Sequence, residues 1–224
     1  MRRPESFIAV SDLVHCHTCP VRYYYEKGKE RAESERYAVC KQLSYHLGNT
    51  LDPAAIWDEV LLVRPSIGPA QREFLEHCVN ACRKREWRAA ASYDLRVISE
   101  KQGIVGMADR AFSGNGFSII RATGALPYGI SSADRLRIAA ISLCIEEITG
   151  GSCPGGSVEY IPDGISRSHE VQPRDRRMLM TVLRTIRRIH DGDVPERPLN
   201  APCGKCSYRE RCETCGGRRL SELL

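Results

Sequence analysis

The spacing of hydrophobic residues separates a helical first part of the chain from a strand-rich middle. Between residues 34 and 92, apolar residues recur at helical intervals, which predicts helices over 34–47, from Asp52 onward and over 68–92. Asp52 is a typical N-cap, and Pro53 suits the first helical position. The apolar side of the long third helix comprises Phe74, Leu75, Cys78, Cys82 and Trp87. Nearer the N-terminus, Ser11 is a candidate N-cap for a short helix that ends at Cys19–Pro20.

The middle of the chain has short runs rich in β-branched residues. The runs 93–101, 103–112 and 116–123 are separated by Gly or Gly-Asn turns, which predicts a strand meander. A capped helix over 131–150 follows. It is apolar on most sides, so we expect it to pack deeply against the sheet. The runs 156–162 and 166–172 then predict two more strands.

The last predicted helix begins at Pro173 and is amphipathic. Its inward stripe comprises Met178, Leu179, Val182, Leu183, Ile186 and Ile189. Its outer face carries Arg176, Arg177, Arg184, Arg187 and Arg188. A proline-rich linker leads from this helix to a cysteine-rich end.

This order of elements predicts an α/β domain with a mixed sheet flanked by helices. We divide the chain into an N-terminal segment (1–35), a helical subdomain (36–92), an α/β core (93–195) and a cysteine-rich C-terminal segment (196–224). No apolar run has the length of a membrane span, and the start has no stretch typical of a signal peptide. We therefore expect a cytoplasmic protein without membrane contact.

The net charge of +5 is concentrated near the C-terminus. From residue 173 to residue 224, Lys and Arg outnumber Asp and Glu by 12 to 7, whereas the rest of the chain balances at 21 to 21. A basic patch is typical of nucleic-acid-binding proteins. A solvated arginine face without a partner explains the charge equally well.

Eleven cysteines in a protein that we expect to be cytoplasmic, where thiols stay reduced, indicate metal or cluster chemistry together with buried thiols. Five of them lie among apolar or alanine-rich neighbours and are predicted core residues: Cys40, Cys78, Cys82, Cys144 and Cys153. The others form three C-x₂-C pairs: Cys16 with Cys19, Cys203 with Cys206, and Cys212 with Cys215.

Two metal sites compete for these pairs. In the first, Cys203, Cys206, Cys212 and Cys215 hold a zinc ion. In the second, three of them and one distant cysteine hold an iron-sulfur cluster. Spacing alone does not decide between the zinc ion and the cluster. Cys19, which lies far upstream of the other pairs and is followed by a proline, favours the cluster.

Four segments resemble one known family, the CRISPR-associated RecB-like exonucleases. They are "SDL…CPVRYYYE", "GIVGMADRAF", "DRLRIAAISLCIEE" and "CGKCSYRERC". The resemblance implies a RecB-type PD-(D/E)XK nuclease-like domain whose two ends meet at a 4Fe-4S cluster. Its implied ligands are Cys19, Cys203, Cys206 and Cys212, with no place for Cys16 or Cys215. It also implies a role in spacer acquisition, with protospacer DNA ends and the CRISPR integrase complex as partners.

The same resemblance locates the catalytic positions, and several are altered. His46 and Asp109 stand where the family has its histidine and first carboxylate. The family's Glu-x-Lys is replaced by Ile120-Arg121-Ala122, and Arg137 and Ile141 stand in place of a glutamine and a tyrosine. Because isoleucine offers no oxygen to Mg²⁺ or Mn²⁺, we expect impaired catalysis. Glu100 and Asp134 are candidate substitute ligands, which would leave an active metal-dependent exonuclease for single-stranded DNA.

Arginine can hold phosphate without a metal ion. We therefore predict DNA contacts for Arg121 and Arg137, and for Arg184, Arg187 and Arg188 of the last helix. A zinc-binding interaction protein, unrelated to CRISPR, is the alternative of another class.

Overall fold

The computed structural model describes residues 7–198 and 201–215, without the side chains of 205 and 213–215. In this part of the chain, six strands form one mixed sheet in which β3 (Ile104–Ala111) is central. β2 (Ser92–Ser99) pairs antiparallel along the whole of β3. The predicted meander is thereby confirmed, with β4 (Phe117–Arg121) as its third strand.

The other edge of β3 is shared by two strands. β1 (Ile8–Ala9), which the sequence did not predict, runs parallel to the start of β3. β4 pairs antiparallel with its end, through Phe117 and Ser118 only. The rest of β4 pairs in parallel with β5 (Gly155–Tyr160), which pairs antiparallel with β6 (Ile165–Glu170). The sheet therefore forks where β4 leaves β3, next to Asp109.

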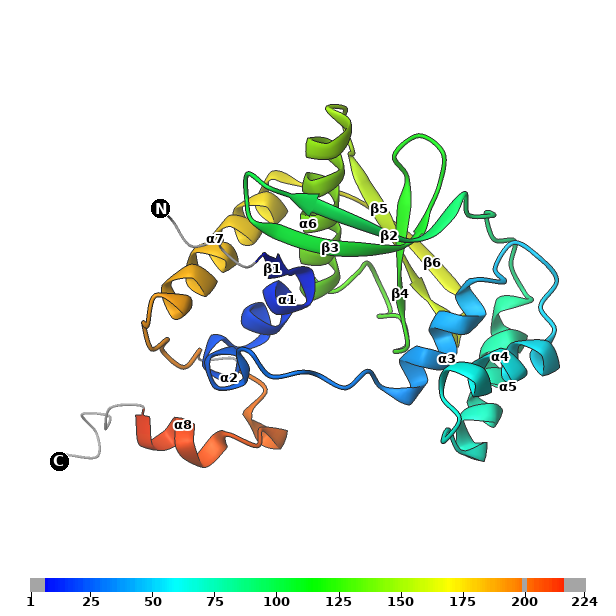
Figure 1. Ribbon diagram of the computed structural model, residues 1–224, viewed down its shortest axis with the longest axis horizontal. Helices are drawn as coiled ribbons and strands as arrows, with labels where there is room; N and C mark the ends of the chain where they lie inside the picture. Colours follow the sequence, from blue (N-terminus) through cyan, green and yellow to red (C-terminus); the bar gives the residue numbers. More distant parts are fainter. Residues whose placement is uncertain (1–6, 199–200, 216–224) are drawn as a thin grey trace.

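Helices cover both faces of the sheet (Figure 1). α6 (Ser132–Thr149), α1 (Val10–Thr18) and α7 (Pro173–His190) pack on one face and share its hydrophobic core. α3 (Glu35–Ser44), α4 (Pro53–Val63) and α5 (Pro69–Cys82) form a second cluster. Ile119 belongs to the first core and its neighbour Ile120 to the second, as expected for successive residues of a strand. The α/β class with a mixed sheet flanked by helices is confirmed.

Two predicted helix boundaries are wrong. α5 ends at Cys82, and Trp87 lies beyond it, where its indole Nε1 donates to the Cys82 carbonyl oxygen at 2.9 Å. The indole thus caps the helix while its ring packs on the second cluster. Ser11 is not an N-cap, because α1 begins at Val10 directly after the extended Ala9 of β1.

Gly106 allows β3 to approach α1 closely. A Cβ atom at this position would lie 2.7 Å from Cγ2 of Val10, closer than side-chain atoms tolerate. Close packing against Val10 therefore explains the glycine of the Gly-x-x-Asp pattern. Its last residue, Asp109, belongs to the candidate site.

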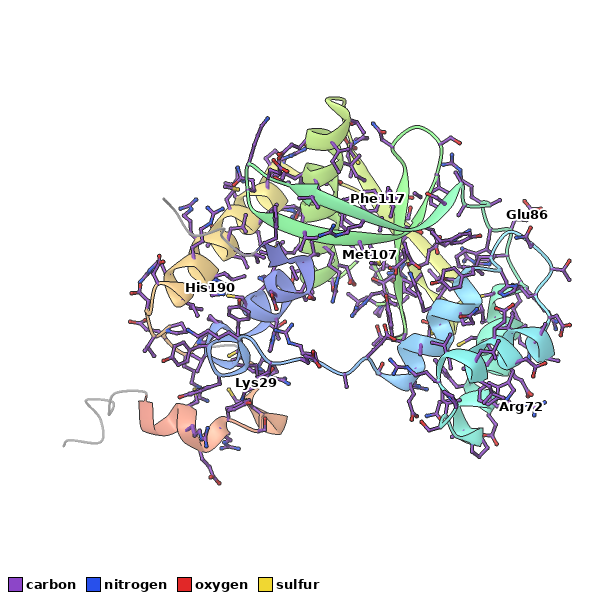
Figure 2. The ribbon with its side chains drawn as sticks, in the orientation of Figure 1. Lys29, Arg72, Glu86, Met107, Phe117 and His190 are labelled. Carbon is purple, nitrogen blue, oxygen red and sulfur yellow. The ribbon has the colours of Figure 1, made fainter. Side chains whose placement is uncertain are left out.

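The segment around α2 (Pro20–Glu26) lies beside the described C-terminal segment. Tyr25 of α2 stacks on Tyr208, with ring centroids 5.2 Å apart, just before α8 (Arg209–Cys215). Lys29, labelled in Figure 2, donates to the Tyr208 hydroxyl at 3.1 Å. No helix in the described ranges is long and apolar enough to cross a membrane.

Candidate functional site

Asp109 lies at the fork of the sheet, and its carboxylate is buried and accepts hydrogen bonds from three donors. Lys41 Nζ lies 2.7 Å from Oδ1, and the Tyr37 hydroxyl donates to the same oxygen at 3.1 Å. The Ile120 backbone N–H donates to Oδ2 at 2.8 Å. The carboxylate thus satisfies a backbone donor of β4 where that strand has left β3. These three contacts occupy three of the roughly four lone-pair sites of the carboxylate, so a metal ion would compete with them.

Lys41 is the residue that the sequence analysis missed at this position. It comes from the buried side of α3 and pairs with Asp94 as well as with Asp109. Burial disfavours the charged ammonium, but the two carboxylates more than compensate and raise the pKa of Lys41. Lys41 therefore stays a cation beside Asp109. No Glu-x-Lys motif marks it, because it lies on a helix rather than on the strand.

Glu159 is a second residue of the site that the sequence patterns did not single out. It lies on β5 directly opposite Ile120 of β4. Arg110 Nη1 lies 2.7 Å from its Oε1, and both side chains are buried. Burial raises the pKa of Glu159, with Asp109 contributing through its negative charge, although Arg110 acts in the opposite direction. In the sequence, Glu159 is the single charged residue of the "GSVEY" run, but the sequence does not reveal that Arg110 and Asp109 lie close to it.

Arg121 and Arg137 meet at one shared carboxylate. Asp134 Oδ1 lies 3.2 Å from Arg121 Nε and 3.0 Å from Arg137 Nη1. Burial and the charge of Arg121 lower the pKa of Arg137, although arginine remains protonated. Two guanidinium groups against one carboxylate leave a surplus positive charge, as a phosphate-binding site needs.

Across the fork, the acidic and basic groups balance. The carboxylates are those of Asp94, Asp109, Asp134 and Glu159, and the cations are those of Lys41, Arg110, Arg121 and Arg137. A divalent cation is normally held by a surplus of carboxylate charge. Here four side-chain cations of the chain pair with the four carboxylates, so no surplus remains.

The remaining catalytic candidates lie elsewhere. His46 Nε2 contacts Glu59 of α4 at 2.8 Å, and this hydrogen bond lowers the pKa of Glu59. Glu100 lies in the exposed turn between β2 and β3, at the far end of β3 from Asp109. Ile141 is buried in the first core. The catalytic role of His46 stays a prediction.

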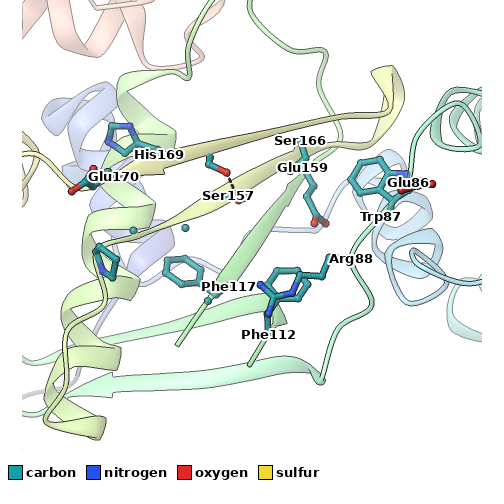
Figure 3. Close-up of a pocket in the computed structure, with 15 residues that line it drawn as sticks. Glu86, Trp87, Arg88, Phe112, Phe117, Ser157, Glu159, Ser166, His169 and Glu170 are labelled. Carbon is teal, nitrogen blue, oxygen red and sulfur yellow. Dashed lines mark hydrogen bonds between the residues drawn. The ribbon is translucent and has the colours of Figure 1, made fainter. Parts of the chain in front are cut away.

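A cleft of about 710 Å³ approaches the site from the side of Glu159 (Figure 3). Ser157, Glu159 and His169 of the β5–β6 hairpin line one side. Phe112 and the segment that contains Trp87 and Arg88 line the other. The guanidinium of Arg88 lies 4.8 Å from the centre of the Phe112 ring. The cleft is therefore aromatic and cationic on one side and polar on the other.

Four thiols surround a small cavity between the start of α2 and the described C-terminal segment. They belong to the predicted cluster ligands, Cys19, Cys203, Cys206 and Cys212. Arg22 and Arg197 line the same cavity, and the Arg22 backbone N–H donates to Cys19 Sγ at 3.4 Å. Burial raises the pKa of Cys212. The donor set fits an iron-sulfur cluster, whose ligands are thiolates.

The other cysteines differ from these four. Cys16 is buried in the first core, and burial raises the pKa of its thiol to about 12. Cys40, Cys78, Cys82, Cys144 and Cys153 are completely buried, as predicted. The side chain of Cys215 lies outside the described residues, so the zinc set that includes it stays untested. Within the described part, no three His, Cys, Asp or Glu side chains converge closely enough for one metal ion.

The outer face of α7 is basic, as its pattern predicted. Arg184, Arg187 and Arg188 are exposed, and Leu179, Leu183 and Ile186 are buried. Arg176 departs from the prediction, because it folds back to a bidentate pair with Glu146 of α6 at 3.0 and 2.8 Å. Arg187 donates to the Gln102 carbonyl oxygen at 2.8 Å.

Comparison with known proteins supports the fold class. No protein-family model and no curated protein matches the chain. A crystal structure described as a "Putative exonuclease" from Eubacterium rectale has a similar fold, with a TM-score of 0.57 and 14% sequence identity. The match covers 96% of this chain and 89% of that one. The chain thus shares its overall fold with that structure.

Proposed function

We propose that this is a nuclease-fold DNA-binding protein of CRISPR adaptation that carries a 4Fe-4S cluster and has impaired catalysis. The nuclease-like fold supports nucleic acid as the partner. The CRISPR role and the integrase partner rest on the motif resemblance alone, in "GIVGMADRAF" and "CGKCSYRERC" above all.

The contacts of Asp109 and Glu159 support impaired catalysis. The Asp109 carboxylate accepts from Lys41, Tyr37 and the Ile120 N–H, while Glu159 is paired with Arg110. Ile120 and Ala122 contribute no oxygen ligand, and Lys41 would compete with a metal ion for Asp109 Oδ1. The protein then holds DNA through cationic side chains, with Arg121 and Arg137 at the fork and Arg184, Arg187 and Arg188 on α7.

DNA binding is tested by titrating labelled DNA at several salt concentrations. Each arginine lost from a phosphate contact should reduce the slope of log affinity against log salt by about one. We expect this for Arg121→Ala, Arg137→Ala and Arg184→Ala. Arg176→Ala is the matched control, because that side chain is turned toward Glu146. Equal slopes in all four variants would refute the assigned contacts.

The second candidate function is a metal-dependent exonuclease that acts on single-stranded DNA and processes protospacers. The exonuclease-like fold over nearly the whole chain favours it. The decisive assay incubates excess protein with end-labelled DNA and Mn²⁺, beside Asp109→Asn. We expect no products beyond those of the variant, and products from the wild-type protein alone would establish the enzyme.

The placement of Cys19 beside Cys203, Cys206 and Cys212 around one cavity supports the cluster, because the zinc set of four C-terminal cysteines would not include Cys19. Iron and sulfide are to be quantified after anaerobic purification of Cys19→Ala, Cys212→Ala and, as controls, Cys16→Ala and Cys215→Ala. Iron lost from the Cys215 variant but retained by the Cys19 variant would contradict the ligand set.

A further inference from the structure

The loop of residues 122–130, between β4 and α6, presents an aromatic side chain to solvent. Tyr128 is 91% exposed, and Leu126 beside it is 45% exposed. The loop begins directly after Arg121 and ends at Ser131, the N-cap of α6. We call residues 122–130 the Tyr128 loop.

Both ends of this loop are fastened to one carboxylate. Arg121 lies 3.2 Å from Asp134 Oδ1, and the Ser131 hydroxyl donates to Asp134 Oδ2 at 2.8 Å. The Tyr160 hydroxyl donates to the same Oδ2 at 3.2 Å. Asp134 therefore closes the base of the loop and also holds the arginine pair of the candidate DNA site.

The middle of the loop is braced on either side of Tyr128. Arg167 of β6 donates to the carbonyl oxygens of Pro127, at 3.3 Å, and of Gly129. The Ala125 N–H donates to Asp163 Oδ2 at 2.6 Å. Gly129 has φ of 61°, a left-handed conformation that glycine adopts without strain. The exposed ring thus stands on a backbone that is fixed before any partner binds, which reduces the entropy lost on binding.

We infer that Tyr128 stacks on an unpaired base of a DNA strand whose phosphates contact Arg121 and Arg137. This inference rests on the proposed DNA-binding function and names its preferred substrate, single-stranded or frayed DNA. Charge complementarity favours a nucleic acid as the partner, because Arg121 of the arginine pair directly precedes the loop and Arg167 contacts its backbone. Tyrosine provides a flat face for a base, and stacking of this kind tolerates any sequence.

The test compares Tyr128→Ala with Tyr128→Phe by fluorescence anisotropy on labelled single-stranded DNA and on a blunt duplex. Tyr128→Ala should weaken single-strand binding about tenfold, while Tyr128→Phe retains it. The blunt duplex should bind all three proteins alike. Because the ring adds no charge, the salt slope should stay that of the wild type.

An oligonucleotide with abasic positions supplies the internal control, since it removes the bases and keeps the phosphates. It should bind Tyr128→Ala and wild type equally. If Tyr128→Ala bound normal single-stranded DNA as tightly as the wild type does, the inference would be overturned, but the proposed function would not. The same holds if Tyr128→Ala weakened self-association in sedimentation and left DNA binding intact. Failure of the wild-type protein to bind any DNA would overturn the proposed function as well.

Discussion

Lys41 Nζ lies 2.7 Å from Asp109 Oδ1, so a lysine from helix α3 occupies the cation position beside the first carboxylate of the candidate site. Both side chains are largely buried. The pair joins the helical cluster to the fork of the sheet. In the proposed function, its lysine takes the place of a metal ion.

Removing Lys41 should be costly. Lys41→Met leaves the buried Asp109 carboxylate without its cation, and we expect a loss of about 3 kcal/mol in the free energy of unfolding. The double variant Lys41→Met/Asp109→Asn removes both charges and should lose clearly less. Urea denaturation of the wild type, both single variants and the double variant measures the coupling. A double variant as unstable as the sum of the singles would show that the pair is not coupled.

Glu159 should make stability depend on pH. Its pKa is raised, so the folded state binds its proton more tightly than the unfolded state does. The corresponding stability is present below the ordinary value of 4.5 and is lost as pH rises through the folded pKa. Glu159→Gln should remove this dependence, which amounts to at most about 1.4 kcal/mol per pH unit. Thermal denaturation from pH 4 upward, with the exposed Glu170→Gln as control, checks it. If the stability of the wild type and that of Glu159→Gln changed with pH in parallel, the raised pKa of Glu159 would be refuted.

The Glu146–Arg176 pair should act in the opposite direction. The hydrogen bonds from Arg176 hold the pKa of Glu146 below its ordinary value of 4.5. Its stabilisation is therefore present above that value and lost as pH falls through the folded pKa. Arg176→Met should cost about 1 kcal/mol near neutral pH, and the cost should vanish in acid. Arg177→Met, on the exposed side of α7, is the control. A cost that persists in acid would point to packing rather than charge.

Sequence patterns located the elements better than the site. The β-branched runs and Gly turns predicted β2, β3 and β4, because strand alternation is a local property. β1 was missed because two residues carry no periodicity. Lys41 and Glu159 were missed because they reach the fork from a helix and a distant strand, and no spacing records such contacts.

The balance of charge around Asp109 was equally invisible in sequence. Arg121 and Arg137 were read as free to hold phosphate, whereas Asp134 shares its charge between them. The resemblance to a known family implied that Cys19 acts together with the C-terminal cysteines, which spacing alone left open. The four thiols line one cavity, and their metal stays a prediction.

In the proposed function, the chain's own cations fill the place of a catalytic metal ion. Titration of the anaerobically purified protein with Mn²⁺, following free Mn²⁺ by electron paramagnetic resonance, tests it most directly. We predict the same weak binding for wild type and Asp109→Asn. One tightly bound Mn²⁺ per wild-type chain, absent from Asp109→Asn, would contradict the account.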